Sequence, residues 1–156
     1  MFLLRKIGYL LRGNATPFQI ISGCLFGAML GFMPGFAQAP GLIAVLMLTL
    51  VVLNANLVLA ALVGLSVKLL SLALLPVSFA AGRLLLDGPT EPLFRALINA
   101  PVFALFGFES YVATGGLLIG GLLGLVIGIL VARGIHAFRR KMAELGQNSP
   151  RYQAFM

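Results

Sequence analysis

Lys68 is the residue of this sequence most able to do chemistry, because it is a charge in the middle of a long apolar run. The run extends from Leu57 to about Leu86. A charge at the centre of a membrane segment costs on the order of 2.5 to 3.5 kcal/mol and is functional by default. An ammonium there is suited to binding an anion, such as a lipid phosphate or another acidic solute in a cavity.

Small and polar residues share the helical face of Lys68 and extend the predicted site. Gly64, Ser71, Ser78 and Gly82, with Ala60 and Ala61, share a single helical face with the lysine, all within about 100° of one another. Such a stripe is typical of a face that packs against protein rather than lipid. A break at Asn54-Ala55-Asn56 precedes the run and supplies polar backbone. We predict a substrate-binding site composed of Lys68, Gly64, Ser71, Ser78, Asn54 and Asn56.

A structural role for Lys68 is the alternative. Carbonyl groups freed at helix breaks could accept its hydrogen bonds, as could the side chains of Asn54, Asn56, Gln19 or Gln38. Glu109 could pair with Lys68 only if the chain between Pro101 and Phe108 enters the membrane. Otherwise Glu109 is an interfacial acid, which is the interpretation that we favour.

The remaining reactive side chains are too few for an elaborate active site. The chain has one histidine, one cysteine and four carboxylates, whereas most enzymes need several convergent titratable groups. His136 stands among arginines, and Cys24 has no second cysteine with which to form a disulfide within the chain. We therefore predict no catalytic residue, no metal site and no cofactor, and we do not expect an enzyme.

The composition predicts a membrane protein. Of 156 residues, 60% are hydrophobic and only 10% are charged, whereas a soluble domain carries about 25% charged residues. The net charge of +7 could indicate nucleic acid in a soluble protein, but here the charges flank the apolar runs. This is the positive-inside pattern, which predicts two cytoplasmic termini, an even number of crossings and no nucleic acid. The flanking residues are Arg5, Lys6 and Arg12 before the first run, and Arg133, Arg139, Arg140 and Lys141 after the last.

We predict an all-α, polytopic integral membrane protein of a single domain, residues 1–156, with about four membrane segments and amphipathic helices at the surface. Pro76 should kink the long third run by freeing the carbonyl of Leu72, and Thr90 can cap the helix that follows, which should extend through Asn99. The predicted parts are an interfacial amphipathic helix at 1–13, two short apolar segments at 17–53, a long kinked helix at 57–86, an interfacial helix at 90–107, a span at 112–134 and a loose tail at 146–156.

The two short apolar segments allow two arrangements. The first, from Phe18 to Met33, has about 16 residues and the second, from Gly41 to Leu53, about 13, where a full span needs about 17 to 25. They are either two short tilted spans or a re-entrant hairpin whose tip is Pro34-Gly35. Thr16 followed by Pro17 is a helix-start signal for the first of them.

Two apolar runs carry glycine at every fourth residue. This spacing makes a smooth stripe on one helix face and lets another backbone approach closely. We predict that the stripes pack helices together, and the alternative is a pathway lined by bare backbone. The stripes are Gly23, Gly27 and Gly31 in the first run and Gly116, Gly120, Gly124 and Gly128 in the last.

Several motifs together resemble a family of small bacterial inner-membrane proteins of unknown function. They are the stretch from Asn14 to Gln19 with the glycine helix and Pro34-Gly35, the Asn54-Ala55-Asn56 break, and the segment from Leu93 to Pro101. The resemblance covers roughly residues 14–131. It implies the bacterial inner membrane and this order of spans, and it lends no catalytic residue. The sequence departs from the family pattern before Pro76, where Leu75 stands in place of an acidic residue.

Two functions follow as hypotheses. The first is the handling or translocation of an anionic amphipathic molecule such as a phospholipid, with Lys68 at the site. The alternative is a non-transport subunit or anchor of a cell-envelope complex, in which the glycine stripes dock a partner helix. We expect membrane lipids as partners, together with either further copies of the chain or another membrane protein.

Overall fold

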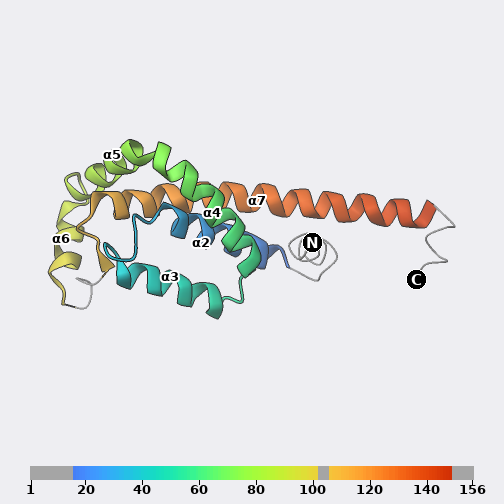
Figure 1. The fold of residues 1–156 in the computed structure, drawn as a ribbon, viewed down its shortest axis with the longest axis horizontal. Coiled ribbons are helices and arrows are strands. Elements are labelled where there is room, and N and C mark those ends of the chain that lie inside the picture. The colour runs from blue at the N-terminus through green and yellow to red at the C-terminus, as the bar shows by residue number, and fades with distance from the viewer. Residues whose placement is uncertain (1–15, 102–105, 149–156) are drawn as a thin grey trace.

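The computed structural model describes residues 16–101 and 106–148, so the helix predicted at 1–13 lies outside the described residues. As predicted, the described chain is all-helical (Figure 1). Its helices are α2 (Pro17–Phe32), α3 (Pro40–Val52), α4 (Leu57–Ala73), α5 (Leu75–Leu86), α6 (Glu91–Asn99) and α7 (Tyr111–Asn148).

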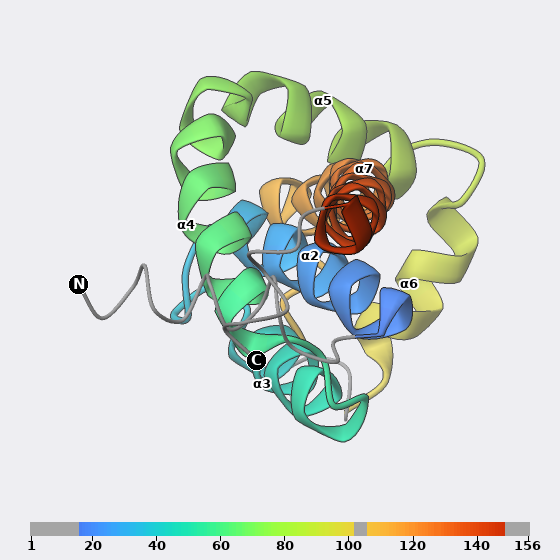
Figure 2. The same ribbon diagram turned by 90° about the vertical axis from the view of Figure 1, so that its right-hand side faces the viewer.

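Helices α2 and α7 form a central antiparallel pair, around which α3, α4, α5 and α6 are arranged (Figure 2). Glycines of α7 let the two backbones approach closely. A methyl group added to Gly116 would lie 2.8 Å from the carbonyl oxygen of Phe32, and one added to Gly128 would lie 3.1 Å from the Cα of Ile21. The start of α7 therefore faces the end of α2.

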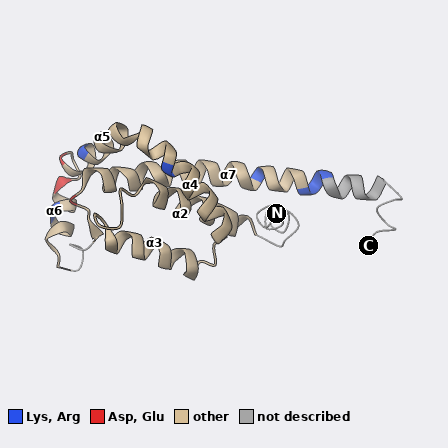
Figure 3. Ribbon diagram, viewed as in Figure 1, with Lys and Arg blue, Asp and Glu red and all other residues tan. Residues whose placement is uncertain are grey.

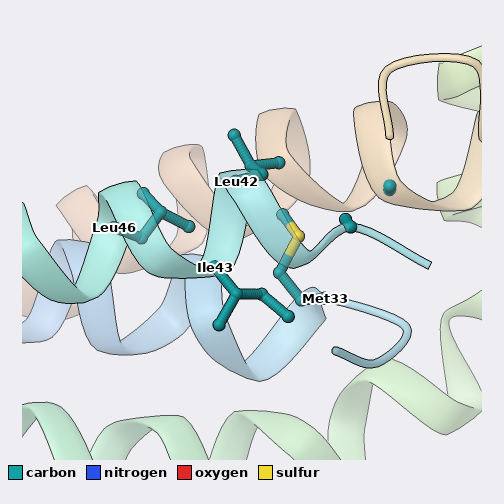
Figure 4. Close-up of a cluster of buried hydrophobic side chains, with 6 residues drawn as sticks. Met33, Leu42, Ile43 and Leu46 are labelled. Atoms are coloured by element: carbon teal, nitrogen blue, oxygen red, sulfur yellow. The ribbon is translucent and has the colours of Figure 1, made fainter. Parts of the chain in front are cut away.

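Helix α4 packs in parallel against another face of α2. A methyl group on Gly23 would lie 2.8 Å from the carbonyl oxygen of Asn56, and one on Gly31 would lie 2.7 Å from that of Gly64. These contacts show that α2 and α4 run in the same direction. Helix α3, which connects them in the chain, therefore runs in the opposite direction. A buried cluster joins the end of α2, the first half of α3 and the start of α7 (Figure 4). It comprises Met33, Ala39, Leu42, Ile43, Leu46 and Ala113.

The third apolar run is two helices rather than one kinked helix. Helices α4 and α5 meet at Leu74 with a bend of 84°. Pro76 lacks an amide hydrogen and its ring crowds the carbonyl of Leu72, which weakens the helix at this point. Packing of α5 on α7 then fixes the new direction, because Ser78 contacts Gly115 at the crossing.

Among the described residues, only α7 is long and apolar enough to cross a bilayer by itself, over Tyr111–Lys141. Helices α4 and α5 reach that length only when taken together, and α2 and α3 have 16 and 13 residues. One clear membrane-length helix therefore stands where we expected about four segments. Helix α7 also extends past the predicted end at residue 134 and includes residues 146–148 of the predicted tail.

Helix α6 is shorter than the interfacial helix predicted at 90–107. It ends at Asn99, the end expected for the helix after Thr90, because Pro101 disfavours helical geometry at Ala100, which is extended. Thr90 precedes α6 but makes no side-chain cap. Its hydroxyl donates instead to the carbonyl of Leu85.

Large aliphatic side chains cover the outside of the molecule. Val52, Leu65, Leu69 and Leu84 are each more than 70% exposed. The closest helix contacts are made by glycine and alanine instead. Large exposed aliphatic side chains together with close glycine contacts between helices are typical of a membrane protein.

Candidate functional site

Helices α2, α3 and α4 enclose an open groove of about 590 Å³ (hereafter the Lys68 groove). Its walls are almost entirely apolar, and Lys68 is the one charged residue among those that line it. The lining residues are Gly27, Leu30, Gly31, Met33, Gly35, Ile43, Met47, Leu50, Val51, Leu57, Ala60, Ala61, Gly64, Leu65 and Lys68.

The Lys68 ammonium lies at the end of α2. Its Nζ donates a hydrogen bond of 2.6 Å to the carbonyl oxygen of Met33, the residue that ends α2. Carbonyl groups at a helix C-terminus lack partners within the helix and carry partial negative charge. An ammonium has three donor hydrogens, and the described residues supply one acceptor. The contact therefore holds the lysine in place and leaves donors for a ligand.

Lys68 is near one end of α7, although it lies midway along the third apolar run of the sequence. Met33, its acceptor, packs in the cluster that contains Ala113, the third residue of α7. The preceding residue, Phe32, faces Gly116. The ammonium is therefore level with the first two turns of α7. The break at Leu74 places Lys68 near the end of α4, which ends at Ala73, five residues after the lysine.

The structure brings only part of the predicted site together. Gly64 and Lys68 line the groove. Ser71 is buried behind them, and its hydroxyl donates to the carbonyl of Lys68 at 2.8 Å. Ser78 is carried away by the 84° bend and is 2% exposed in the α5–α7 contact.

Asn54 and Asn56 lie at the other end of α4 from Lys68 and do not line the groove. Asn54 adopts a positive φ of 49° in the turn after α3. The Asn56 side chain caps α4 by accepting from the amide of Leu59 at 3.1 Å, and its own amide donates to the carbonyl of Gln19 at 3.1 Å. Twelve residues separate Asn56 from Lys68, about 18 Å along a helix. Asn54 thus lies in the turn before α4 and Asn56 caps the helix, and neither residue contacts the ammonium.

All seven glycines of the two stripes contact another helix of the same chain. Gly23, Gly27 and Gly31 face α4, and Gly116, Gly120, Gly124 and Gly128 face α2. A partner helix could not use these faces without separating α2 from its neighbours. Sequence reasoning missed the contribution of α3 to the groove, whose Ile43, Met47 and Val51 form a wall. No periodic signal distinguishes these residues from lipid-facing ones, since α3 is apolar on every side.

A second, polar pocket of about 230 Å³ lies at the α6 end of the molecule. Glu109 lines it together with Arg95 and Tyr111, while Lys68 does not. The Tyr111 hydroxyl donates to Asp87 at 3.1 Å, and Arg95 pairs with Glu91 at 3.0 Å. Glu109 and Lys68 therefore belong to different sites.

Charge is segregated along the molecule (Figure 3). Asp87, Glu91 and Glu109 lie at the α6 end, where Arg83 and Arg95 lie beside Asp87 and Glu91. Arg133 and His136 lie on the projecting part of α7, with Arg139, Arg140 and Lys141 beyond them. In the described part of the chain, no three His, Cys, Asp or Glu side chains are close enough to hold a metal ion.

Comparison of the chain with protein-family models, with curated proteins and with solved structures found no match. The resemblance to small inner-membrane proteins stays a prediction. The described residues form an all-helical structure with one membrane-length helix, an apolar exterior and an apolar groove with a cation at one end.

Proposed function

We propose that the chain is a multi-pass protein of the bacterial inner membrane that binds and translocates an anionic amphipathic molecule, such as a phospholipid, in the Lys68 groove. The observation that carries the proposal is the composition of this groove. Its walls are apolar and its single charged residue is a cation. A phospholipid has the complementary design of an apolar chain joined to an anionic phosphate, and phosphate forms strong hydrogen bonds with ammonium donors.

The arrangement of helices supports four membrane segments formed by α2, α3, the bent pair α4–α5, and α7. Helix α2 begins and α7 ends toward the same end of the molecule (Figure 1), as an even number of crossings requires. The basic residues after Ala132 mark that end as cytoplasmic by the positive-inside rule. The balanced charges at the α6 end suit the opposite side.

A role as subunit or anchor of an envelope complex is the second candidate, but the structure offers it less support. That hypothesis relied on the glycine stripes to dock a partner helix, and the stripes are occupied by α2, α4 and α7 of the same chain. A partner protein or a further copy would have to bind elsewhere on the apolar exterior.

Filling the groove without disturbing the core tests the proposal. Ala61 lines the groove and is exposed, so Ala61→Phe should occupy the lipid volume and leave helix packing unchanged. Ala80 is also exposed but lies on α5, away from the groove, which makes Ala80→Phe the matched control. Each protein is purified in mild detergent, co-purifying phospholipid is quantified, and transbilayer movement of a labelled anionic phospholipid is measured after reconstitution.

We expect Ala61→Phe to lose both bound phospholipid and transbilayer movement, while Ala80→Phe retains both. Equal lipid content and equal movement in the two variants would refute the proposal. A stoichiometric second protein that co-purifies with a lipid-free chain would favour the subunit hypothesis instead.

A further inference from the structure

We propose that the Lys68 groove takes its lipid from the non-cytoplasmic leaflet, with the phosphate at Lys68 and one acyl chain directed toward Leu57. This inference rests on the proposed function, because it assumes that the groove is the lipid site. It adds the orientation of the ligand and the leaflet that supplies it.

The position of the groove along α7 indicates which leaflet it faces. The Lys68 end is level with the first two turns of α7, because Lys68 bonds to Met33 and the preceding Phe32 faces Gly116. The Leu57 end follows Asn56, which contacts Gly23 of α2. That part of α2 faces Gly124 and Gly128 of α7. The apolar run of α7 from Val112 to Val131 has its middle near Gly121. The groove thus runs from the Tyr111 side of the membrane to slightly past its middle.

The length of the groove matches the thickness of one leaflet. From Leu57 to Lys68, α4 advances eleven residues, which is about 16 Å at about 1.5 Å per residue. The hydrocarbon core of a bilayer is about 30 Å thick, so the groove has the length of one leaflet. An acyl chain lying in it needs no unusual folding and ends near the bilayer midplane.

The position of the Lys68 charge in the groove indicates the orientation of the lipid. The cation lies only at the end near Tyr111, and the Leu57 end is apolar. A lipid from the Tyr111-side leaflet brings its phosphate to Lys68 and its chain to Leu57 in its normal orientation. A lipid from the opposite leaflet would have to place its phosphate at the apolar end or invert. The side of Tyr111 is non-cytoplasmic because the basic cluster lies at the other end of α7.

The absence of tryptophan from the chain permits a direct test, since any introduced tryptophan is the only one. Leu65 and Leu57 line the two ends of the groove and are exposed, so each is replaced by tryptophan separately. Leu130→Trp, on the exposed surface of α7 away from the groove, is the control. The full chain in detergent is titrated with low molar ratios of phosphatidylglycerol brominated either near the carboxyl group or near the methyl end of its acyl chain.

We expect saturable quenching in which carboxyl-proximal bromine acts more strongly on Leu65→Trp and methyl-proximal bromine acts more strongly on Leu57→Trp. The reverse order would overturn the proposed orientation and leaflet while the groove stayed the lipid site. Quenching no stronger than that of Leu130→Trp would overturn both this inference and the proposed function. Adding Lys68→Met should weaken the apparent affinity about tenfold, because a hydrogen bond to a charged group is lost. An unchanged affinity would remove Lys68 as the phosphate contact.

Discussion

The Lys68 Nζ lies 2.6 Å from the carbonyl oxygen of Met33, thirty-five residues earlier in the chain. This contact connects α4 to the C-terminal end of α2 and places the cation beside the loop that leads into α3. Cations near a helix C-terminus interact favourably with its dipole. The lysine thus has a structural contact and lies in the groove at the same time, and the two roles can be separated by substitution.

Replacing Lys68 should destabilise the protein moderately. Lys68→Met leaves the Met33 carbonyl without this donor, and we expect a loss of about 2 kcal/mol, typical of a hydrogen bond to a charged group. Lys68→Arg keeps the charge and should recover most of that loss. Arg133→Met, which removes a cation from exposed α7, is the control. Cys24 is the single cysteine and is fully buried, so the rate at which a permeant thiol reagent labels it in detergent reports unfolding. Equal labelling of Lys68→Met and Arg133→Met would contradict the structural role.

Two glycines of different helices should respond to alanine in opposite ways. A methyl group on Gly27 would collide with the backbone of Ala60, which lies 2.7 Å away at its Cα and cannot rotate aside. Gly27→Ala should therefore force α2 and α4 apart and cost about 1 to 3 kcal/mol. Gly134 has no atom within 4 Å of an added methyl group, so Gly134→Ala should stabilise α7 by up to about 1 kcal/mol. Thermal unfolding monitored by circular dichroism measures both, and a Gly27→Ala protein as stable as the parent would disprove the tight contact.

Removal of the Ser78 hydroxyl should stabilise the α5–α7 contact. Its oxygen is buried and has no hydrogen-bond partner among the described residues, and such a group costs about 1 to 3 kcal/mol. We expect Ser78→Ala to raise the unfolding temperature. Ser71→Ala is the comparison, because that hydroxyl donates to the Lys68 carbonyl and its loss should lower the temperature. A lower temperature for both variants would show that Ser78 also makes a hydrogen bond.

Thr16 should contribute to stability through the start of α2. Its hydroxyl accepts from the amide of Gln19 at 3.3 Å, and the Gln19 side chain accepts from the Thr16 amide at 3.2 Å. Removal of such a cap costs about 1 kcal/mol, so Thr16→Ala should lower the free energy of unfolding by that amount. Thr49→Ala tests specificity, since that hydroxyl only donates to the Val45 carbonyl within α3. Unfolding in a denaturing detergent provides the measurement, and equal effects at the two threonines would argue against the cap.

Local features of the sequence predicted much of the secondary structure. Thr16 and Pro17 predicted the start of α2, and Pro34-Gly35 and Asn54-Ala55-Asn56 predicted the breaks around α3. These signals act through the backbone of a few neighbouring residues, so they do not depend on the rest of the fold. Element lengths were less predictable. Helix α7 continues to Asn148 because nothing in its basic end stops a helix, whereas α6 ends at the predicted Asn99 and does not fill the wider segment of 90–107.

The sequence by itself determined that the described chain is helical and apolar, and it singled out Lys68 as the charge in the middle of its long apolar run. Only the tertiary structure decided where that charge lies. A helical projection treats residues 57–86 as one straight helix and places Ser78 beside Lys68. The 84° bend at Leu74 separates them, and the Pro34-Gly35 break brings the Met33 carbonyl to the ammonium instead. Helical periodicity describes contacts within a turn or two, whereas the direction after a break is set by packing against distant segments, here α5 on α7.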